Sequence, residues 1–170
     1  PVKELGERTA LAVEPREVER LTGQRLPALT PVRAATLDLA LEQLPEGAAI
    51  FGLGMDESLY FSLHSRWATL APEGGAVVHV AKYLGRRAAD AVADRAQLEG
   101  FADVLMPGWR ACVRHARFLP EMHVTQAAHG LEGRPDVGAI DGVRIAGDWV
   151  GPEGMLADAA VASGRRAARS

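Results

Sequence analysis

Apolar and polar positions alternate along several short stretches of the chain, a pattern typical of strands with one buried face. In 32–41 the apolar residues recur at every second position, so Asp38 is expected on the face opposite to Leu37 and Leu39. Apolar runs predict further strands at 8–13, 48–53, 59–63, 76–81, 114–118 and 143–146. Short turns join several of them, and the clearest is 72–75. The pattern favours an antiparallel or mixed sheet.

Helical spacing of apolar residues is strongest in 86–106, and Pro107 ends that segment. A short helix is expected at 17–21 with Gly23 as its C-cap, and an alanine-rich helix at 156–169. Pro120 is expected to end the strand 114–118, and 130–135 to form a loop. Strands and helices together predict an α+β fold.

Composition restricts the class of protein. The 170 residues, 48% of them hydrophobic, suit one ordinary domain or two small ones. A net charge of −3 gives no electrostatic reason to expect nucleic acid as a partner. No apolar run approaches the roughly 20 residues of a spanning helix. No signal peptide is visible either, so a cytoplasmic location is expected. The sequence leaves membrane association open. The single cysteine, Cys112, excludes an internal disulfide.

Two motifs are weak candidates for chemistry. Gly52 and Gly54 match the first glycines of a dinucleotide-binding fingerprint, but Glu57 occupies the third position and a strand follows, so a hairpin turn is the better interpretation. The histidines have neither the i, i+4 spacing of a metal-binding helix nor a well-placed carboxylate partner, so no metal is expected. His79 lies within an apolar strand and is interpreted as a core or sheet-face residue.

The segment 142–168 is more informative. It predicts a buried strand that ends in Gly147 and Asp148, then a glycine-rich crossing, then a helix with small residues. A carboxylate at the end of a strand can accept hydrogen bonds from a ligand hydroxyl, and glycines allow close approach of the backbone. The N-terminus of the helix offers amide groups and about half a positive charge. On spacing alone, a purely structural strand, loop and helix is an equal alternative.

This segment resembles the C-terminal flavin-binding motif of FAD-dependent oxidoreductases of the amine oxidase, protoporphyrinogen oxidase and phytoene desaturase group, with a close match to the phytoene-dehydrogenase-like branch. The likeness covers Ala146-Gly147-Asp148-Trp149 and the helix 158–168. Other segments that resemble this branch are 37–41, 56–62, 64–65, 70–74 and 107–110.

The resemblance implies FAD as cofactor and an apolar small molecule as substrate, which would give up hydride to flavin N5. Asp148, flanked by Gly147 and Trp149, would accept a hydrogen bond from a ribityl hydroxyl. Backbone amides around Gly154, Met155 and Leu156 would face the flavin pyrimidine edge. The resemblance assigns no catalytic residue, and neither the substrate nor the electron acceptor follows from it.

The resemblance also divides the chain. It implies the end of a cofactor-domain segment at 1–24, a substrate-binding-like domain at 25–140 and the C-terminal, Rossmann-like FAD-binding strand, loop and helix at 141–170. No G-x-G-x-x-G of the kind that binds the ADP half of FAD is found in this sequence, so we expect a C-terminal fragment. By itself it should bind FAD weakly or not at all, and it should pair with a missing N-terminal half or form a homodimer. The alternative is a stand-alone α+β module for interaction or small-molecule binding, without catalytic activity.

Overall fold

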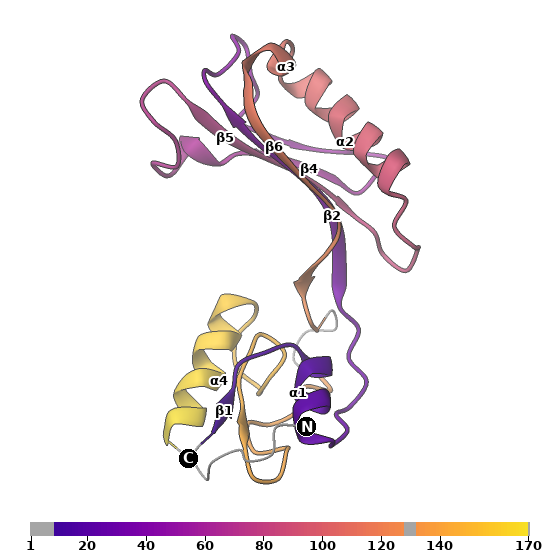
Figure 1. Cartoon of the computed structure of the whole chain (residues 1–170), viewed down its shortest axis with the longest axis vertical. Coiled ribbons are helices and arrows are strands. Elements are labelled where there is room, and N and C mark those ends of the chain that lie inside the picture. The colour runs from indigo at the N-terminus through magenta and orange to yellow at the C-terminus, as the bar shows by residue number, and fades with distance from the viewer. Residues whose placement is uncertain (1–8, 128–131, 170) are drawn as a thin grey trace. The chain divides into compact units, whose positions relative to one another are not determined.

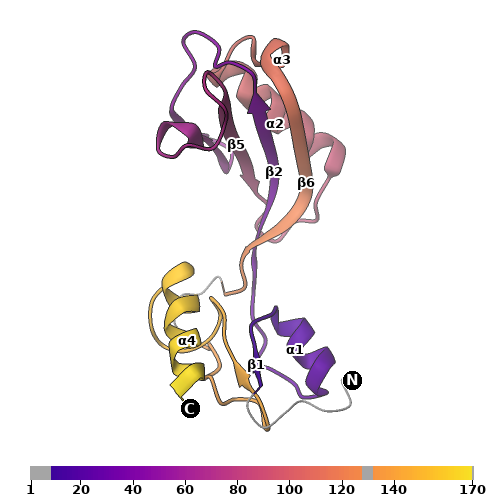
Figure 2. The same ribbon diagram turned by 60° about the vertical axis from the view of Figure 1, so that its left-hand side comes forward.

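The structure, a computed structural model, describes residues 9–127 and 132–169. The chain forms two compact units, one of residues 33–123 and the other of the described parts of 1–32 and 124–170. Figures 1 and 2 show the helices and strands of each unit. The fold is α+β, with an antiparallel five-stranded sheet and a small parallel sheet. The roles assigned above to 1–24, 25–140 and 141–170 stay predictions. In the described residues, no helix has the length and apolar character needed to cross a membrane.

The 33–123 unit is a sheet with one long helix on one face (Figure 1). The strand order is β3-β4-β5-β2-β6, and the pairs β3–β4, β4–β5 and β5–β2 are antiparallel. Its elements are β2 (Val32–Leu41), β3 (Phe51–Leu53), β4 (Leu59–Leu63), the 3-10 helix η1 (His64–Arg66), β5 (Ala76–Tyr83), α2 (Ala91–Leu105), α3 (Trp109–Cys112) and β6 (Val113–Thr125).

From Leu37 onward, strand β2 has the alternation that its sequence predicts, whereas Ala34 and Thr36, on the face of Asp38, are buried as well. Leu37 and Leu39 are buried, whereas the Asp38 side chain keeps 37% of its surface exposed on the other face. The buried face packs against α2 through Leu98 and Ala102. One face of the sheet is therefore the core of the unit, and α2 leaves the opposite face uncovered. On that face the 3-10 helix η1 places His64 against His79 of β5.

Helix α2 begins later than predicted. The helical spacing starts at 86, but the Asp90 side chain accepts a hydrogen bond from the Ala93 amide at 3.0 Å and caps a helix that starts at Ala91. The preceding residues form a turn whose Arg87 side chain reaches back to the helix. The Asp90 N-cap and the ion pair of Arg87 determine where α2 begins, and the spacing of apolar residues carries no information about either contact.

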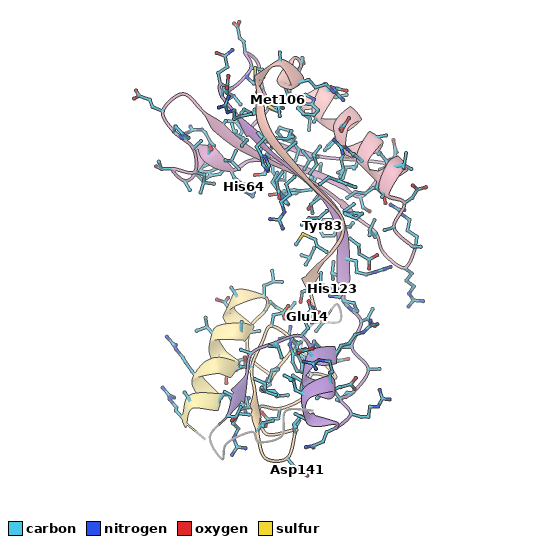
Figure 3. All side chains as sticks on the ribbon, viewed as in Figure 1. Glu14, His64, Tyr83, Met106, His123 and Asp141 are labelled. Carbon is cyan, nitrogen blue, oxygen red and sulfur yellow. The ribbon has the colours of Figure 1, made fainter. Side chains whose placement is uncertain are left out.

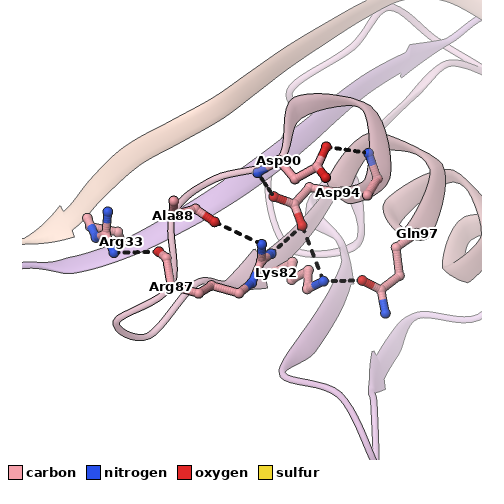
Figure 4. A network of polar contacts seen from close by, with 8 residues as sticks. Arg33, Lys82, Arg87, Ala88, Asp90, Asp94 and Gln97 are labelled. Carbon is pink, nitrogen blue, oxygen red and sulfur yellow. Dashed lines mark hydrogen bonds and ion pairs between the residues drawn. The ribbon is translucent and has the colours of Figure 1, made fainter.

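Asp94 is the centre of the polar network in Figure 4. Its carboxylate is fully buried, accepts a hydrogen bond from Arg87 and one from the Asp90 amide at 2.9 Å, and lies 3.2 Å from Lys82 Nζ. Burial raises the pKa of Asp94, but the Arg87, Asp90 and Lys82 hydrogen bonds outweigh that effect and hold the pKa below its ordinary value. The network fastens the start of α2 to β5.

The prediction that Pro120 ends its strand is wrong. Strand β6 continues through this proline to Thr125. Since β6 is the last strand in the order, one side of it needs no ladder hydrogen bonds, and a residue without an N–H group is tolerated there. An ion pair joins Arg33 of β2 to Glu121 of β6, with 3.2 Å between Arg33 Nη1 and Glu121 Oε1.

The predicted hairpin at Gly52 and Gly54 is confirmed. Strands β3 and β4 pair directly, and the Gly54 amide donates to the Leu59 carbonyl at 2.9 Å. A Cβ atom on Gly54 would lie 2.4 Å from the carbonyl oxygen of Glu57, so this tight turn requires glycine. The turn geometry therefore explains why glycine occupies this position, without any role in nucleotide binding.

The other unit contains β1 (Ala10–Leu11), α1 (Pro15–Thr22), β7 (Arg144–Ile145) and α4 (Ala157–Arg169). Strands β1 and β7 are parallel and shorter than the predicted 8–13 and 143–146, of which residue 8 is outside the described part. Gly23 ends α1 in the left-handed conformation expected of a C-cap, with φ of 73°. The buried core consists of Val18, Ala127, Val137, Ile140, Val143, Ile145, Trp149 and Val150. Of the loop predicted at 130–135, the first two residues are also outside the described part.

Candidate functional site

The carboxyl ends of β1 and β7 meet at one edge of the small parallel sheet. Leu11 pairs with Ile145, and the Ala146 amide donates to the Leu11 carbonyl at 3.0 Å. The chain that follows β1 therefore emerges beside Gly147 and Asp148, which follow β7. In parallel sheets this edge is where ligands bind.

An open hollow of about 460 Å³ lies at this edge. Its lining comes from segments far apart in the sequence: Ala12, Val13, Glu14, Gln126, Ala146, Gly147, Asp148, Trp149, Ala160 and Gly164. Small residues of α4 and apolar residues after β1 form much of this surface, and two carboxylates provide its charge. Such a mixture of apolar surface and few polar groups is typical of a small-molecule site.

Asp148 lies at the rim of this hollow with a defined orientation. The backbone amide of Gln126 donates to Asp148 Oδ2 at 3.1 Å. A carboxylate offers about four lone-pair directions, so this bond leaves Asp148 capacity to accept further hydrogen bonds. The site thus presents an oriented acceptor, which is the role that the resemblance implies for Asp148.

Gly147 brings the backbone close to its neighbours. A Cβ atom at this position would lie 2.6 Å from Trp149 Nε1, so a larger residue would displace the indole. The Gly147 amide donates to Ser163 Oγ at 3.0 Å, which fixes the end of β7 to α4. Trp149 itself is 1% exposed and belongs to the core, so it supports the hollow from beneath.

The residues predicted to face the flavin pyrimidine edge lie at the N-terminal end of α4 and do not line the hollow. Gly154 has φ of 71° and a Cβ there would lie 2.8 Å from Asp158 Cβ. Leu156 adopts φ of 51°, a strained conformation for a residue with a side chain. The Met155 and Leu156 side chains are about half exposed. The backbone of Gly154, Met155 and Leu156 therefore lies at the N-terminal end of α4, which is the positive end of the helix dipole.

The sequence interpretation missed part of the lining. Gln126 and Glu14 contribute to the hollow, although no motif contains either residue. The pairing of β1 with β7 brings Glu14, which precedes α1, to this edge, and the hydrogen bond of its amide to Asp148 places Gln126, which follows β6, at the same hollow. No short-range signal in the sequence could have revealed this proximity.

The expectation that no histidine has a well-placed carboxylate partner is wrong. His79 Nδ1 is hydrogen-bonded to Asp38 Oδ1 on the neighbouring strand. His79 is a sheet-face residue with 26% of its side chain exposed, as one of the two interpretations of it held. Within residues 9–127 and 132–169, no three metal-ligating side chains are grouped so that they could hold an ion.

Two solved structures have a similar fold. An oxidoreductase from Methanosarcina mazei superposes with a TM-score of 0.56 at 18% identity, over 84% of this chain and 35% of that one. A protein from Exiguobacterium sp. 255-15, named "Putative protoporphyrinogen oxidase", superposes with a TM-score of 0.53 at 12% identity, over 95% of this chain and 41% of that one. The chain thus spans about two fifths or less of either protein. No protein-family model matches the chain, and a search of curated proteins also finds no match.

Proposed function

We propose that the chain is the C-terminal part of an FAD-dependent oxidoreductase, a dehydrogenase or desaturase that removes hydride from an apolar substrate. The observation that carries this proposal is Asp148, held as an oriented acceptor at the hollow where the carboxyl ends of β1 and β7 meet. The names of the two structurally similar proteins support the oxidoreductase class. The chemistry that FAD supplies when bound is acceptance of the hydride at flavin N5.

The residues of the site fit the flavin half of FAD. Asp148 would accept a hydrogen bond from a ribityl hydroxyl, and the glycine cradle at Gly147 would let the backbone approach the ligand. The N-terminal end of α4 does not line the hollow, but the helix dipole there favours negative charge on a ligand. The chain's own contribution is therefore to bind and orient the flavin.

The charged residues of the hollow restrict the chemical class of its ligand further. Glu14 and Asp148 both line it, and carboxylates accept hydrogen bonds but repel phosphate. The hollow thus suits a polyol and a ring and does not suit a pyrophosphate. In the proposed enzyme, the adenosine and pyrophosphate parts of FAD would be bound by other residues than these.

Riboflavin, FMN and FAD should therefore bind this chain with similar, weak affinities. The test is a titration of each flavin followed by flavin fluorescence, with equilibrium dialysis as a second measurement. Dissociation constants within about threefold of one another, a free-energy difference below about 0.7 kcal/mol, would agree with a site for the flavin half. Tight binding of FAD together with weak binding of riboflavin would contradict it.

Replacing Asp148 by alanine should weaken riboflavin binding about ten- to a hundredfold, since a hydrogen bond to a charged group contributes about 1.5–3 kcal/mol. The matched control is Asp141→Ala, which removes an exposed carboxylate of the same unit that does not line the hollow. Equal affinities of the Asp148 variant and the unaltered chain, or no saturable riboflavin binding at all, would refute the proposed site.

A further inference from the structure

The register of the five-stranded sheet places four side chains in one row. Phe51 of β3 is opposite Ser62 of β4, Ser62 is opposite His79 of β5, and His79 is opposite Asp38 of β2. Cross-strand partners point to the same face of a sheet. Since Leu37 and its neighbours on the other face pack against α2, this row lies on the face that α2 does not cover. Residues from four strands thus meet on one face, where Phe51 is exposed, Asp38 and His79 are partly exposed and Ser62 is buried.

Asp38 orients His79 within this row. A carboxylate can only accept hydrogen bonds, so the contact between Asp38 Oδ1 and His79 Nδ1 requires that Nδ1 carry the proton and donate it. In the neutral ring, the free lone pair is then on Nε2. A histidine fixed in one tautomer by a carboxylate is the arrangement that enzymes use for an oriented general base.

Aromatic rings border the pair. The ring of His64 stacks on that of His79, with 5.3 Å between centroids and 17° between planes. Tyr60 meets His79 edge-on at 6.3 Å, and Phe51 meets Tyr60 edge-on at 5.5 Å. Burial lowers the pKa of His64, repulsion by His79 lowers it further, and Asp38 opposes both effects. His64, labelled in Figure 3, is therefore held largely as a neutral ring at neutral pH and adds to an apolar border.

We propose that His79, oriented by Asp38, is a general base that takes a proton from an acidified C–H bond of a small molecule bound on this face of the sheet. The assignment is independent of the proposed flavin site, which belongs to the other unit. In the step, the C–H bond breaks, the proton goes to His79 Nε2, and the electron pair stays on the substrate, where an adjacent electron-withdrawing or leaving group takes it up. Asp38 is the positioning residue.

A probe that needs no flavin tests the base by itself. In 5-nitrobenzisoxazole a base takes the proton from C3, the C–H electron pair completes the nitrile triple bond, the N–O bond breaks and its electron pair stays on oxygen. The coloured 2-cyano-4-nitrophenolate is followed by absorbance. We expect the chain to accelerate this reaction and His79→Gln to lower its kcat/KM at least tenfold. General-base catalysis typically contributes about 10²–10⁴-fold, so this expected loss is a lower limit.

Two further variants separate base, positioning residue and background. Asp38→Asn should lower kcat with little change in KM, and the double variant with His79→Gln should be no slower than His79→Gln alone, because the two residues act as a unit. His115→Gln, which removes an exposed histidine of β6, is the matched control and should keep the full rate. Circular dichroism verifies that each variant folds.

The outcomes distinguish this proposal from the proposed function. If folded His79→Gln keeps the rate of the unaltered chain, or if His115→Gln loses as much, His79 is not the base. If the probe reaction depends on His79 but riboflavin does not bind, the base stands and the flavoenzyme proposal fails. If riboflavin binds but the probe reaction does not depend on His79, the flavin site stands and the assignment of His79 as a base fails.

Discussion

Replacing Asp94 by alanine should destabilise the 33–123 unit by about 3–5 kcal/mol, the usual cost of removing one partner from a buried ion pair. The carboxylate is fully buried, and its loss leaves Lys82, itself only 12% exposed, without its charged acceptor. The Arg87 side chain and the Asp90 amide lose an acceptor at the same time. The start of α2 should therefore detach from β5.

Native-state hydrogen exchange is the appropriate measurement, since a chain with two compact units does not guarantee a two-state transition. The slowest amides of β2 and β5 should exchange about 200- to 5,000-fold faster in Asp94→Ala, which corresponds to about 3–5 kcal/mol. Glu99→Ala, which removes a more exposed carboxylate from the same helix, should cost about 1 kcal/mol or less. Equal effects of the two substitutions would contradict the importance of the buried network.

The same network predicts an acid dependence. Because the pKa of Asp94 is lower in the folded chain than its ordinary 3.8, the unfolded chain binds a proton more readily. The stabilisation is thus fully present above the ordinary value and is lost as pH falls below it through the folded-state pKa. The difference in stability between the unaltered chain and Asp94→Ala should therefore shrink below pH 4, which denaturant unfolding at several pH values can measure.

Replacing Trp149 by alanine should destabilise the smaller unit by about 3–5 kcal/mol, as expected for the loss of a buried aromatic side chain. Trp149 is the largest fully buried side chain of the chain's described part and packs in a core with Val18 and Ile145. Because Gly147 lies directly against the indole, the cavity would also loosen the backbone that presents Asp148. Riboflavin binding should weaken together with the stability.

The matched control is another tryptophan. Trp67 has 76% of its surface exposed, so Trp67→Ala should change stability by about 0.5 kcal/mol or less. Hydrogen exchange of amides in β7 and α4 reports the unit concerned. Trp149→Phe, which keeps an aromatic ring, should recover part of the loss. If Trp149→Ala and Trp67→Ala cost the same, the packing described for the smaller core is wrong.

Local patterns predicted the sheet well where burial alone decides the structure. The alternation in 32–41 and the apolar run 59–63 give the strands β2 and β4 with the bounds observed. The predictions differ where a neighbour distant in sequence intervenes. Pro120 is tolerated because β6 is an edge strand, and α2 starts late because Asp90 and Arg87 engage polar groups of the helix.

The candidate sites also contain residues that the local sequence identified and residues that only distant pairing brings together. The resemblance singled out Asp148 and Gly147, which the structure places at the rim of a hollow, although their binding role stays a prediction. Glu14 could not be predicted there, since its position depends on the parallel pairing of β1 with β7. His79 met its carboxylate partner only through the register of β5 against β2, which apolar runs do not specify to a single residue.

The pairing of β1 with β7 also has a consequence for how the protein is made. Residues 33–123 leave the ribosome as one uninterrupted stretch and can fold as soon as they emerge. The smaller unit cannot, because Leu11 must wait for Ile145 to be synthesised. Among the described strands, this pairing joins the segments that are farthest apart in the sequence, so its closure carries the larger entropic cost. Within these residues, the hollow beside Asp148 can therefore form only after the whole of the 33–123 unit has been synthesised.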